Sequence, residues 1–328
     1  MSRISSQRFN LVSNRGERFT YCNADEFRVG RGAMGEVFKG WYSSNPEYKV
    51  AIKKVYGRHA ENPQIRSRAR YEASLAIDHP NLIRMLGYCE EDRARGSIYI
   101  ISELVRGETI DKVLRGLTPA MRLKTVPPMM CSALDALHCL HSRTPPVWHR
   151  DLKPSNIMVS DRGEVKVMDL GIATSEGISL GTLEGRGFGT YPYAPPEQIT
   201  GRRSLINATS DIYSAGVTFY ELLTGSNPFA GGSDVDIMEK QITMPLPYNP
   251  AIPKPLFKVL LKATAKRQQD RYQTSRDFKD AIINASKGKG NGGRGAGHSV
   301  SKRHPLVYVA AASLILFLLL IIILLIIT

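Results

Sequence analysis

The glycine-rich segment "GRGAMGEV" limits the folds that the amino-terminal part of the chain can adopt. Gly30, Gly32 and Gly35 fit the pattern GxGxxG, which also occurs at the strand-to-helix turn of dinucleotide-binding folds. Here the glycines are followed by Val37 and Phe38 in a strand-like pattern rather than by a helix. This predicts a glycine-rich hairpin, where backbone N–H groups approach phosphate oxygens without side chains in the way.

The remaining periodicity divides the chain into a sheet-rich part and a helical part. Strand-like alternation extends from Phe27 to Ile52, a helix is predicted over 64–77, and two strands are predicted over 82–89 and 97–105. After Gly107 the predicted helices lie at 119–142, 208–224 and 255–267. Residues 1–24 show no clear period and are expected to form an amino-terminal extension.

Three further segments carry charged or polar residues where phosphate chemistry would need them. Lys53 follows the apolar strand of "VAIKK" and would need anionic partners, unless it is a surface lysine whose charged end reaches solvent. The loop "HRDLKPSN" spans residues 149–156. Asp169 follows a short apolar strand in "VKVMDLG", and its carboxylate could hold Mg²⁺ together with the Asn156 oxygen.

Together these segments resemble the eukaryotic-type (Hanks-type) serine/threonine protein kinase family. Seven of its signatures occur in order: "GRGAMGEV", "VAIK", "HRDLKPSN", "DLG", "GTYPYAPPE", "DIYSAG" and "DRY". The resemblance covers residues 25–285 and implies an α+β, bilobed kinase fold. A small antiparallel-sheet N-lobe with one main helix is expected over about 25–105, a larger mostly helical C-lobe over about 106–285, and ATP between them.

The resemblance implies a role for each matching residue. The glycine-rich loop would cover the ATP phosphates through Val29, Gly30, Arg31, Gly32, Ala33, Met34 and Gly35. The rest of the nucleotide site would be formed by Val37, Ala51 and the backbone of Glu103 and Val105. Ser102, just before this hinge, is small, which predicts an open pocket beside the adenine and transfer from bulky N6-substituted ATP analogues; assays with such analogues would test this.

The catalytic roles follow in the same way. Lys53 would pair with the α- and β-phosphates and with a helix glutamate, for which Glu72 is favoured and Glu61 is the weaker alternative. Asp151 would accept the proton of the substrate hydroxyl, and Lys153 would neutralise the γ-phosphate. Asn156 and Asp169 would bind Mg²⁺, with Mn²⁺ as an alternative metal.

Other positions bear on the substrate and on the architecture of the C-lobe. Lys153, two residues after Asp151, is typical of serine/threonine members of the family, and Thr190 matches the threonine that contacts both. The implied activity is that of a protein serine/threonine kinase (EC 2.7.11.1 type). Glu197 is expected to pair with Arg271, and Asp211 is expected to support the backbone of the HRD loop.

Two alternative functions remain from the sequence. A pseudokinase or scaffold of the same fold would be favoured by loss of the key lysine, aspartates or asparagine, all of which are present. A small-molecule kinase is disfavoured by "GTYPYAPPE", which in the family shapes a surface for peptide substrates.

Regulation by phosphorylation is also expected. Arg150 beside Asp151 marks family members that are commonly switched in this way. The segment between Asp169 and Glu197 offers Thr174, Ser175, Ser179 and Thr182 as acceptors.

The carboxy-terminal residues predict attachment to a membrane. Residues 306–327 carry no charge, and a helix of that length spans roughly 33 Å, about the thickness of a bilayer core. Residues 286–305 form a basic, glycine-rich linker expected at the cytoplasmic face. The expected protein is a single-pass kinase at the cell membrane with its kinase domain in the cytoplasm, similar to bacterial members of the family. Formation of homodimers and phosphorylation of one copy by another are also expected.

Net charge and cysteine usage are compatible with this assignment. The net charge is +14, of which five positive charges lie in the 286–328 tail and the rest are spread without a run of like charges. A spread charge without zinc-finger spacing or interleaved aromatic and basic residues disfavours nucleic acid as a partner. The four cysteines form no CxxC pair, as expected for reduced thiols.

Overall fold

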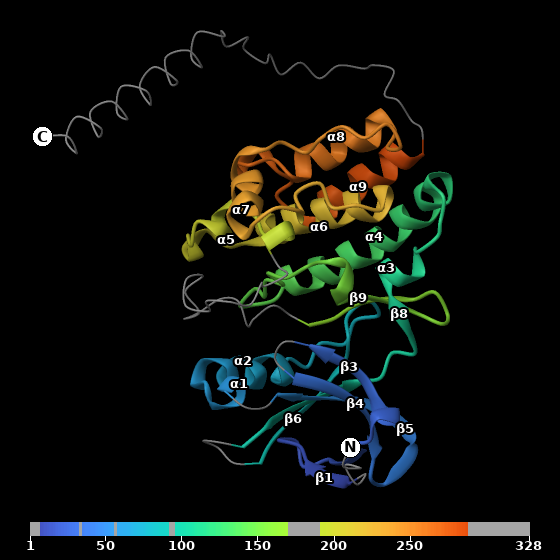
Figure 1. The fold of residues 1–328 in the computed structure, drawn as a ribbon, viewed down its shortest axis with the longest axis vertical. Coiled ribbons are helices and arrows are strands. Elements are labelled where there is room, and N and C mark those ends of the chain that lie inside the picture. The colour runs from blue at the N-terminus through green and yellow to red at the C-terminus, as the bar shows by residue number, and fades with distance from the viewer. Residues whose placement is uncertain (1–6, 33–34, 56–57, 92–95, 170–190, 288–328) are drawn as a thin grey trace, which may run out of the picture. The chain divides into compact units, whose positions relative to one another are not determined.

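The computed structural model describes residues 7–32, 35–55, 58–91, 96–169 and 191–287. These residues form a sheet-rich N-lobe and a helical C-lobe (Figure 1), as the sequence predicts. Within the described ranges, no helix is both long enough and apolar enough to cross a bilayer; the apolar run at 306–327 lies outside them.

The N-lobe contains a seven-stranded antiparallel sheet and a helical segment. Its elements are β1 (Arg8–Val12), β2 (Arg18–Cys22), η1 (Asp25–Phe27), β3 (Arg28–Gly32), β4 (Gly35–Tyr42), β5 (Asn45–Val55), α1 (Arg58–Glu61), α2 (Pro63–Ser74), β6 (Met85–Glu90) and β7 (Ile98–Glu103). The strand order is β1-β2-β4-β5-β7-β6, and β3 pairs with β4.

The C-lobe begins with a small three-stranded sheet and continues as helices packed on one another (Figure 1). Its elements are β8 (Gly107–Thr109), α3 (Ile110–Val113), α4 (Pro119–His141), η2 (Pro154–Asn156), β9 (Ile157–Ser160), β10 (Val165–Val167), η4 (Tyr191–Tyr193), α5 (Pro196–Ile199), η5 (Arg203–Leu205), α6 (Ala208–Thr224), α7 (Asp234–Thr243), α8 (Lys254–Ala263), η6 (Gln268–Asp270) and α9 (Ser275–Ser286).

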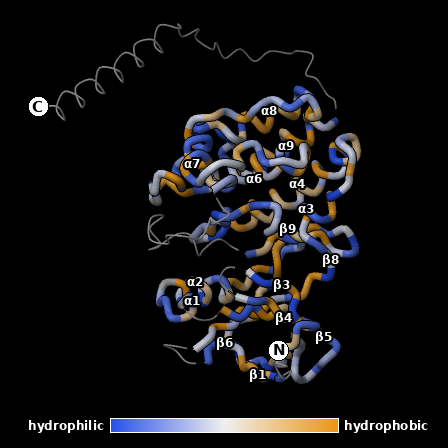
Figure 2. The backbone as a smooth tube through the Cα atoms, in the orientation of Figure 1, coloured by the Kyte–Doolittle hydropathy of each residue, from blue (hydrophilic) through white to orange (hydrophobic). Residues whose placement is uncertain are grey.

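Apolar side chains on both faces of the N-lobe sheet produce two separate cores. Along β7, Tyr99 and Ile101 face one core while Ile98 and Ile100 face the other, as the two-residue period of a strand requires. Helix α2 covers the second face through residues that include Ala69. In the hydropathy view, apolar segments follow the central strands of this sheet (Figure 2).

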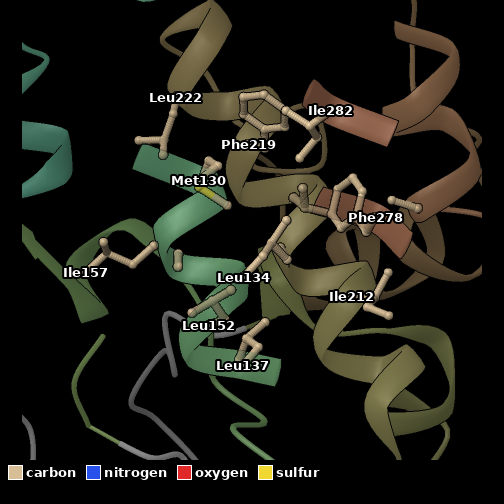
Figure 3. Close-up of a cluster of buried hydrophobic side chains, with 14 of the residues drawn as sticks. Met130, Leu134, Leu137, Leu152, Ile157, Ile212, Phe219, Leu222, Phe278 and Ile282 are labelled. Carbon is tan, nitrogen blue, oxygen red and sulfur yellow. The ribbon is translucent and has the colours of Figure 1, made fainter. Parts of the chain in front are cut away.

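The C-lobe core forms where α4, α6 and α9 pack together (Figure 3). Leu134 and Leu137 of α4 lie among Ile212 and Phe219 of α6, and Phe278 of α9 is fully buried beside them. The same cluster includes Leu152 and Ile157 (Figure 3). This core therefore anchors β9 and the loop that carries His149, Arg150 and Asp151 (the HRD loop).

The N-lobe sheet begins with a hairpin, in residues that the sequence predicts as part of an amino-terminal extension. Strands β1 and β2 pair with each other, and β2 continues onto β4 at Phe19↔Tyr42. Phe19 and Tyr21 are fully buried in the first core. The Asn14 backbone N–H donates to the Tyr88 carbonyl of β6 (2.8 Å), so the hairpin reaches across the sheet to its opposite edge.

Truncation of Tyr21 tests whether this hairpin is integral to the N-lobe. Tyr21→Ala should lower the free energy of unfolding by about 3–5 kcal/mol, because it leaves a cavity in the core. Val12→Ala is the matched control, since Val12 lies in the same hairpin but is 55% exposed, and it should change stability by less than about 0.5 kcal/mol. Denaturant unfolding measures both; equal effects would show that the hairpin does not share the core.

Candidate active site

The HRD loop is held by a buried carboxylate at the start of α6. Asp211 accepts hydrogen bonds from the backbone N–H groups of His149 (2.8 Å) and Arg150 (2.7 Å), and its Oδ2 lies 2.8 Å from His141 Nε2. Burial alone would raise the pKa of Asp211, but the His141 hydrogen bond and these donors hold it below its ordinary value. The predicted support of the HRD loop by Asp211 is confirmed.

This support keeps the loop in a backbone conformation that costs energy. Arg150 has a φ of +64°, in the left-handed region, a conformation that costs about 1–3 kcal/mol in a residue other than glycine. The His149 ring is fully buried beside it, burial lowers its pKa, and its Nε2 donates to the Met168 carbonyl (3.2 Å). The HRD loop is thereby tied to the residue before Asp169.

Asp151, Lys153 and Asn156 converge at the end of this loop. Asp151 Oδ2 accepts from Asn156 Nδ2 (3.0 Å) and pairs with Lys153 Nζ (2.9 Å). Its other oxygen, Oδ1, is buried and has no hydrogen-bond partner among the described residues. A buried acceptor without a donor costs about 1–3 kcal/mol, so a hydroxyl donor placed at this atom would be stabilising.

Lys53 and Asp169 join the two lobes by an ion pair of 2.8 Å. Burial would lower the pKa of Lys53, but the charges of Asp169 and Glu72 raise it above its ordinary value. Lys53 in turn lowers the pKa of Asp169, against the effect of burial. The pair is therefore ionised at neutral pH, and Lys53 is not a lysine that reaches into solvent.

The oxygen ligands that a divalent metal would need are present in the same place. The Asn156 amide nitrogen donates to the Asp151 carbonyl (2.7 Å) as well as to its carboxylate, so the side-chain oxygen is left for a metal. The Asn156 carbonyl accepts from Met168 N–H (3.0 Å), which places Asn156 next to the segment that carries Asp169.

One amide and one carboxylate oxygen suit Mg²⁺, which retains water and binds substrate phosphates. No cluster of three or more His, Cys, Asp or Glu side chains suited to a metal occurs in the ranges that the structure covers.

The glycine-rich loop and the walls of the expected nucleotide site lie on adjacent strands. Gly30 pairs with Val37, Val37 with Lys53, and Ala51 with Ser102. Val29 is 56% exposed and Arg31 lies 3.7 Å from Glu36; Ala33 and Met34 lie outside the described residues, as does Thr190.

Gly35 has a packing role as well as its predicted role at the phosphates. A Cβ at this position would lie 1.9 Å from the Lys54 carbonyl oxygen of β5, so any side chain would push β4 and β5 apart. In contrast, a Cβ at Gly30 would meet nothing within 4 Å. Gly35 therefore allows β4 and β5 to approach each other closely, whereas Gly30 has open space beside it.

The hinge between the lobes contains three contacts that sequence patterns did not indicate. The Glu103 carboxylate pairs with Lys166 of β10 (2.9 Å), and its backbone N–H donates to the Arg84 carbonyl (2.9 Å). The Ser102 hydroxyl donates to the Glu103 carbonyl (3.3 Å), and Val105 follows half-buried between β7 and β8.

Helix α2 is fixed by a cluster of ion pairs on the side away from Glu72. Glu90 of β6 accepts from Arg66 and Arg70 (2.9 Å each). Arg66 is nearly fully buried and also donates to the Ala60 and Gly96 carbonyls. This clamp lies on one flank of the apolar face of α2. Glu72 lies on the other flank, and its charge raises the pKa of Lys53, while Glu61 lies exposed at the end of α1.

The end of the activation segment is fixed to the C-lobe as predicted. Arg271, whose side chain is fully buried, forms two hydrogen bonds with Glu197 (2.8 and 3.0 Å). Ser210 and Gln268 also donate to the Glu197 carboxylate (2.7 and 3.0 Å). The predicted pair is confirmed and forms part of a larger network. The predicted phosphorylation sites Thr174, Ser175, Ser179 and Thr182 lie outside the described residues.

Removal of the Glu90 charge tests the clamp on α2 through its pH dependence. Hydrogen bonds from Arg70 and then Arg66 lower the pKa of Glu90 to about 2, from an ordinary value of 4.5. Since the folded pKa lies below the unfolded one, the stabilisation is complete above pH 4.5 and is lost as the pH falls toward 2.

Glu90→Gln should therefore be less stable than the wild type by about 3 kcal/mol at pH 7, and by less than half of that near pH 3. Denaturant unfolding at both pH values measures the difference. Glu108→Gln is the control, because its pair with Lys112 is exposed and contributes about 0–1 kcal/mol. A difference for Glu90→Gln that does not depend on pH would contradict the clamp.

Comparisons with known proteins can now be set beside this geometry. The family model described as "Protein kinase domain" matches residues 24–284. The probable serine/threonine-protein kinase PknB of Bifidobacterium longum (strain NCC 2705) is 34% identical over 269 residues, covering 78% of this chain and 38% of that protein. The serine/threonine-protein kinase PrkC of Bacillus subtilis (strain 168) is 34% identical over 263 residues, covering 78% and 39%.

Two further matches qualify the comparison. The tyrosine-protein kinase MasK of Myxococcus xanthus (strain DK1622) is 32% identical over 274 residues, covering 78% of this chain and 41% of that protein. Among solved structures, the Mycobacterium tuberculosis PknI kinase domain has the same fold, with a TM-score of 0.58, 21% identity and coverage of 79% of this chain and 94% of that one.

The chain spans only 38–41% of the length of these three curated relatives, so the comparison concerns the shared domain. Within that domain, the family match covers both lobes and every segment of the site described above. The chain therefore belongs to the protein kinase family.

Proposed function

We propose that this chain is a membrane-anchored serine/threonine protein kinase that transfers the γ-phosphate of ATP to protein hydroxyls with Mg²⁺. The family implies ATP, a divalent metal and protein substrates; Mg²⁺ as the metal, rather than Mn²⁺, and Ser or Thr as the acceptor are the finer parts of the proposal. The observation that supports it most directly is the buried Oδ1 of Asp151 beside Lys153 and Asn156, an acceptor to which no described residue donates.

The protein groups divide the work of phosphoryl transfer as follows. Asp151 Oδ1 accepts the hydrogen bond of the acceptor hydroxyl and then its proton, while Lys153 and Asn156 hold the carboxylate in position. Lys53 and Lys153 offset the negative charge that develops on the transferred group. A bound divalent metal would supply further positive charge at the phosphates, held by Asn156 and Asp169.

Transfer from radiolabelled ATP to a generic protein substrate tests this function. Asp151→Asn should lower the rate by about 10²–10⁴-fold, because the amide cannot accept the proton, while the KM for ATP changes little. Asp161→Asn is the control, since Asp161 lies exposed in the β9–β10 turn, and should keep the wild-type rate.

The same assay distinguishes the alternatives. An inactive wild-type chain that still binds ATP would favour the scaffold function. Analysis of the labelled amino acid should find phosphoserine or phosphothreonine; phosphotyrosine alone would contradict the proposed acceptor.

We also propose that residues 306–327 anchor the chain in the cell membrane, with the kinase domain on the cytoplasmic side and residues 286–305 as linker. The proposal is supported by an uncharged run long enough to cross a bilayer, preceded by a linker with positive charge and no acidic residue. Anchoring confines the chains to a surface and raises their local concentration, which favours phosphorylation between neighbouring copies in a transient homodimer.

Removal of the residues after Ser286 tests this effect of the anchor. In dilute lipid vesicles the shortened chain should autophosphorylate more slowly than the full chain, since its copies are no longer concentrated on a surface. Its rate on a soluble peptide should be unchanged, because residues 1–289 form a compact unit of their own. An equal loss of both rates, or no loss of either, would contradict the effect.

A further inference from the structure

Helix α8 has a basic outer face directly opposite its buried face. Leu256, Val259, Leu260 and Ala263 are buried in the C-lobe core. Lys254, Lys258, Leu261 and Lys262 are exposed and recur at spacings that place them on the other side of the helix. Every lysine of the helix therefore lies on the solvent side.

These lysines belong to a segment without any opposing charge. Residues 250–269 contain five basic and no acidic residues. Two of the five are engaged elsewhere: Lys266 donates to the Tyr213 hydroxyl (2.8 Å) and the Gln241 carbonyl (2.7 Å), and Arg267 pairs with Asp270 (2.9 Å).

The three lysines of α8 take part in no ion pair with the residues that the structure covers; Lys262 lies over the Tyr272 ring (4.5 Å). An uncompensated positive surface of this kind suits an anionic partner.

Two apolar side chains border the basic face. Leu261 is 40% exposed within it, and Tyr248 is 52% exposed beside it, in an edge-on contact with Phe257 (5.0 Å between ring centroids). Lysine, leucine and tyrosine together are typical of protein surfaces that lie at the headgroup level of a membrane.

The position of α8 in the fold suits the same partner. Helix α8 packs against α9 at the end of the C-lobe farthest from the N-lobe sheet (Figure 1). Helix α9 is the last described helix, and the chain continues after it into the basic linker and the apolar run. A membrane tether at this point holds α8 at high effective concentration near the lipid surface, so that a weak contact becomes populated.

We propose that the outer face of α8, formed by Lys254, Lys258, Leu261, Lys262 and Tyr248, docks on anionic lipid headgroups. The inference rests on the proposed membrane anchor and adds an orientation to it. With α8 on the lipid surface, the C-lobe core lies between the bilayer and the site at the lobe interface. The site is then turned toward substrates in solution.

Chemical labelling of lysines on the full chain tests this surface. The chain is placed in vesicles of phosphatidylcholine, alone or with added phosphatidylglycerol. Mass spectrometry then measures how fast each lysine amine is acetylated. In the anionic vesicles Lys254, Lys258 and Lys262 should react about fivefold more slowly, and high salt should remove the protection. Lys112 of α3, which is also exposed, should react equally in both.

Two charge-reversal variants separate α8 from net charge. Lys254→Glu with Lys258→Glu should abolish the lipid-dependent protection of Lys262. Arg115→Glu with Arg162→Glu makes the same change in charge at exposed positions off α8 and should retain it. Phosphorylation of a soluble peptide should be unchanged in both variants, because none of these residues belongs to the site.

Flotation of the chain with the same vesicles separates a failure of the proposed anchor from a failure of the proposed docking surface. If the chain floats with both vesicle types but the α8 lysines react equally in each, the docking surface is wrong and the anchor stands. If the chain does not float with phosphatidylcholine, the anchor is wrong. In that case flotation with phosphatidylglycerol that is lost in Lys254→Glu with Lys258→Glu would still support the surface, and no flotation would overturn it.

Discussion

The ion pair between Lys53 and Asp169 is the contact on which the arrangement of the site depends. It joins β5 of the N-lobe to the loop after β10 of the C-lobe across 116 residues of sequence. The backbone of Asp169 is left-handed, with a φ of +51°, and the pair stabilises that conformation. The Lys53 ammonium, whose pKa is raised by the charges of Asp169 and Glu72, is also the group that a triphosphate would require at this point.

Buried contacts around this ion pair fix the HRD loop and helix α2. A single buried carboxylate, that of Asp211, accepts the backbone hydrogen bonds of the HRD loop. Glu90 fixes helix α2 from the side opposite Glu72. Among the described residues, Asp151 Oδ1 is a buried acceptor without a donor, at the point where the substrate would enter. Buried charges thus hold the loops around Asp151 in place.

The sequence predicted the parts of the site whose chemistry is carried by short motifs, and the lobes around them. It failed for partners that belong to no short motif. Arg66 and Arg70 stand four residues apart on a predicted helix, which indicates a shared partner, but nothing in the pattern identifies Glu90. The hairpin at 8–22 was not predicted because its strands are short. Its buried residues, Phe19 and Tyr21, pack in a core whose other residues mostly come later in the sequence.

A crystal structure with a non-hydrolysable ATP analogue, Mg²⁺ and an acceptor peptide would test the central claim most directly. The quantity to measure is the distance from Asp151 Oδ1 to the hydroxyl of the acceptor Ser or Thr. The account predicts a hydrogen bond of about 2.6–3.2 Å there, with Lys53 in contact with the phosphates. A hydroxyl bound away from Asp151, or a nucleotide bound away from Lys53, would contradict it.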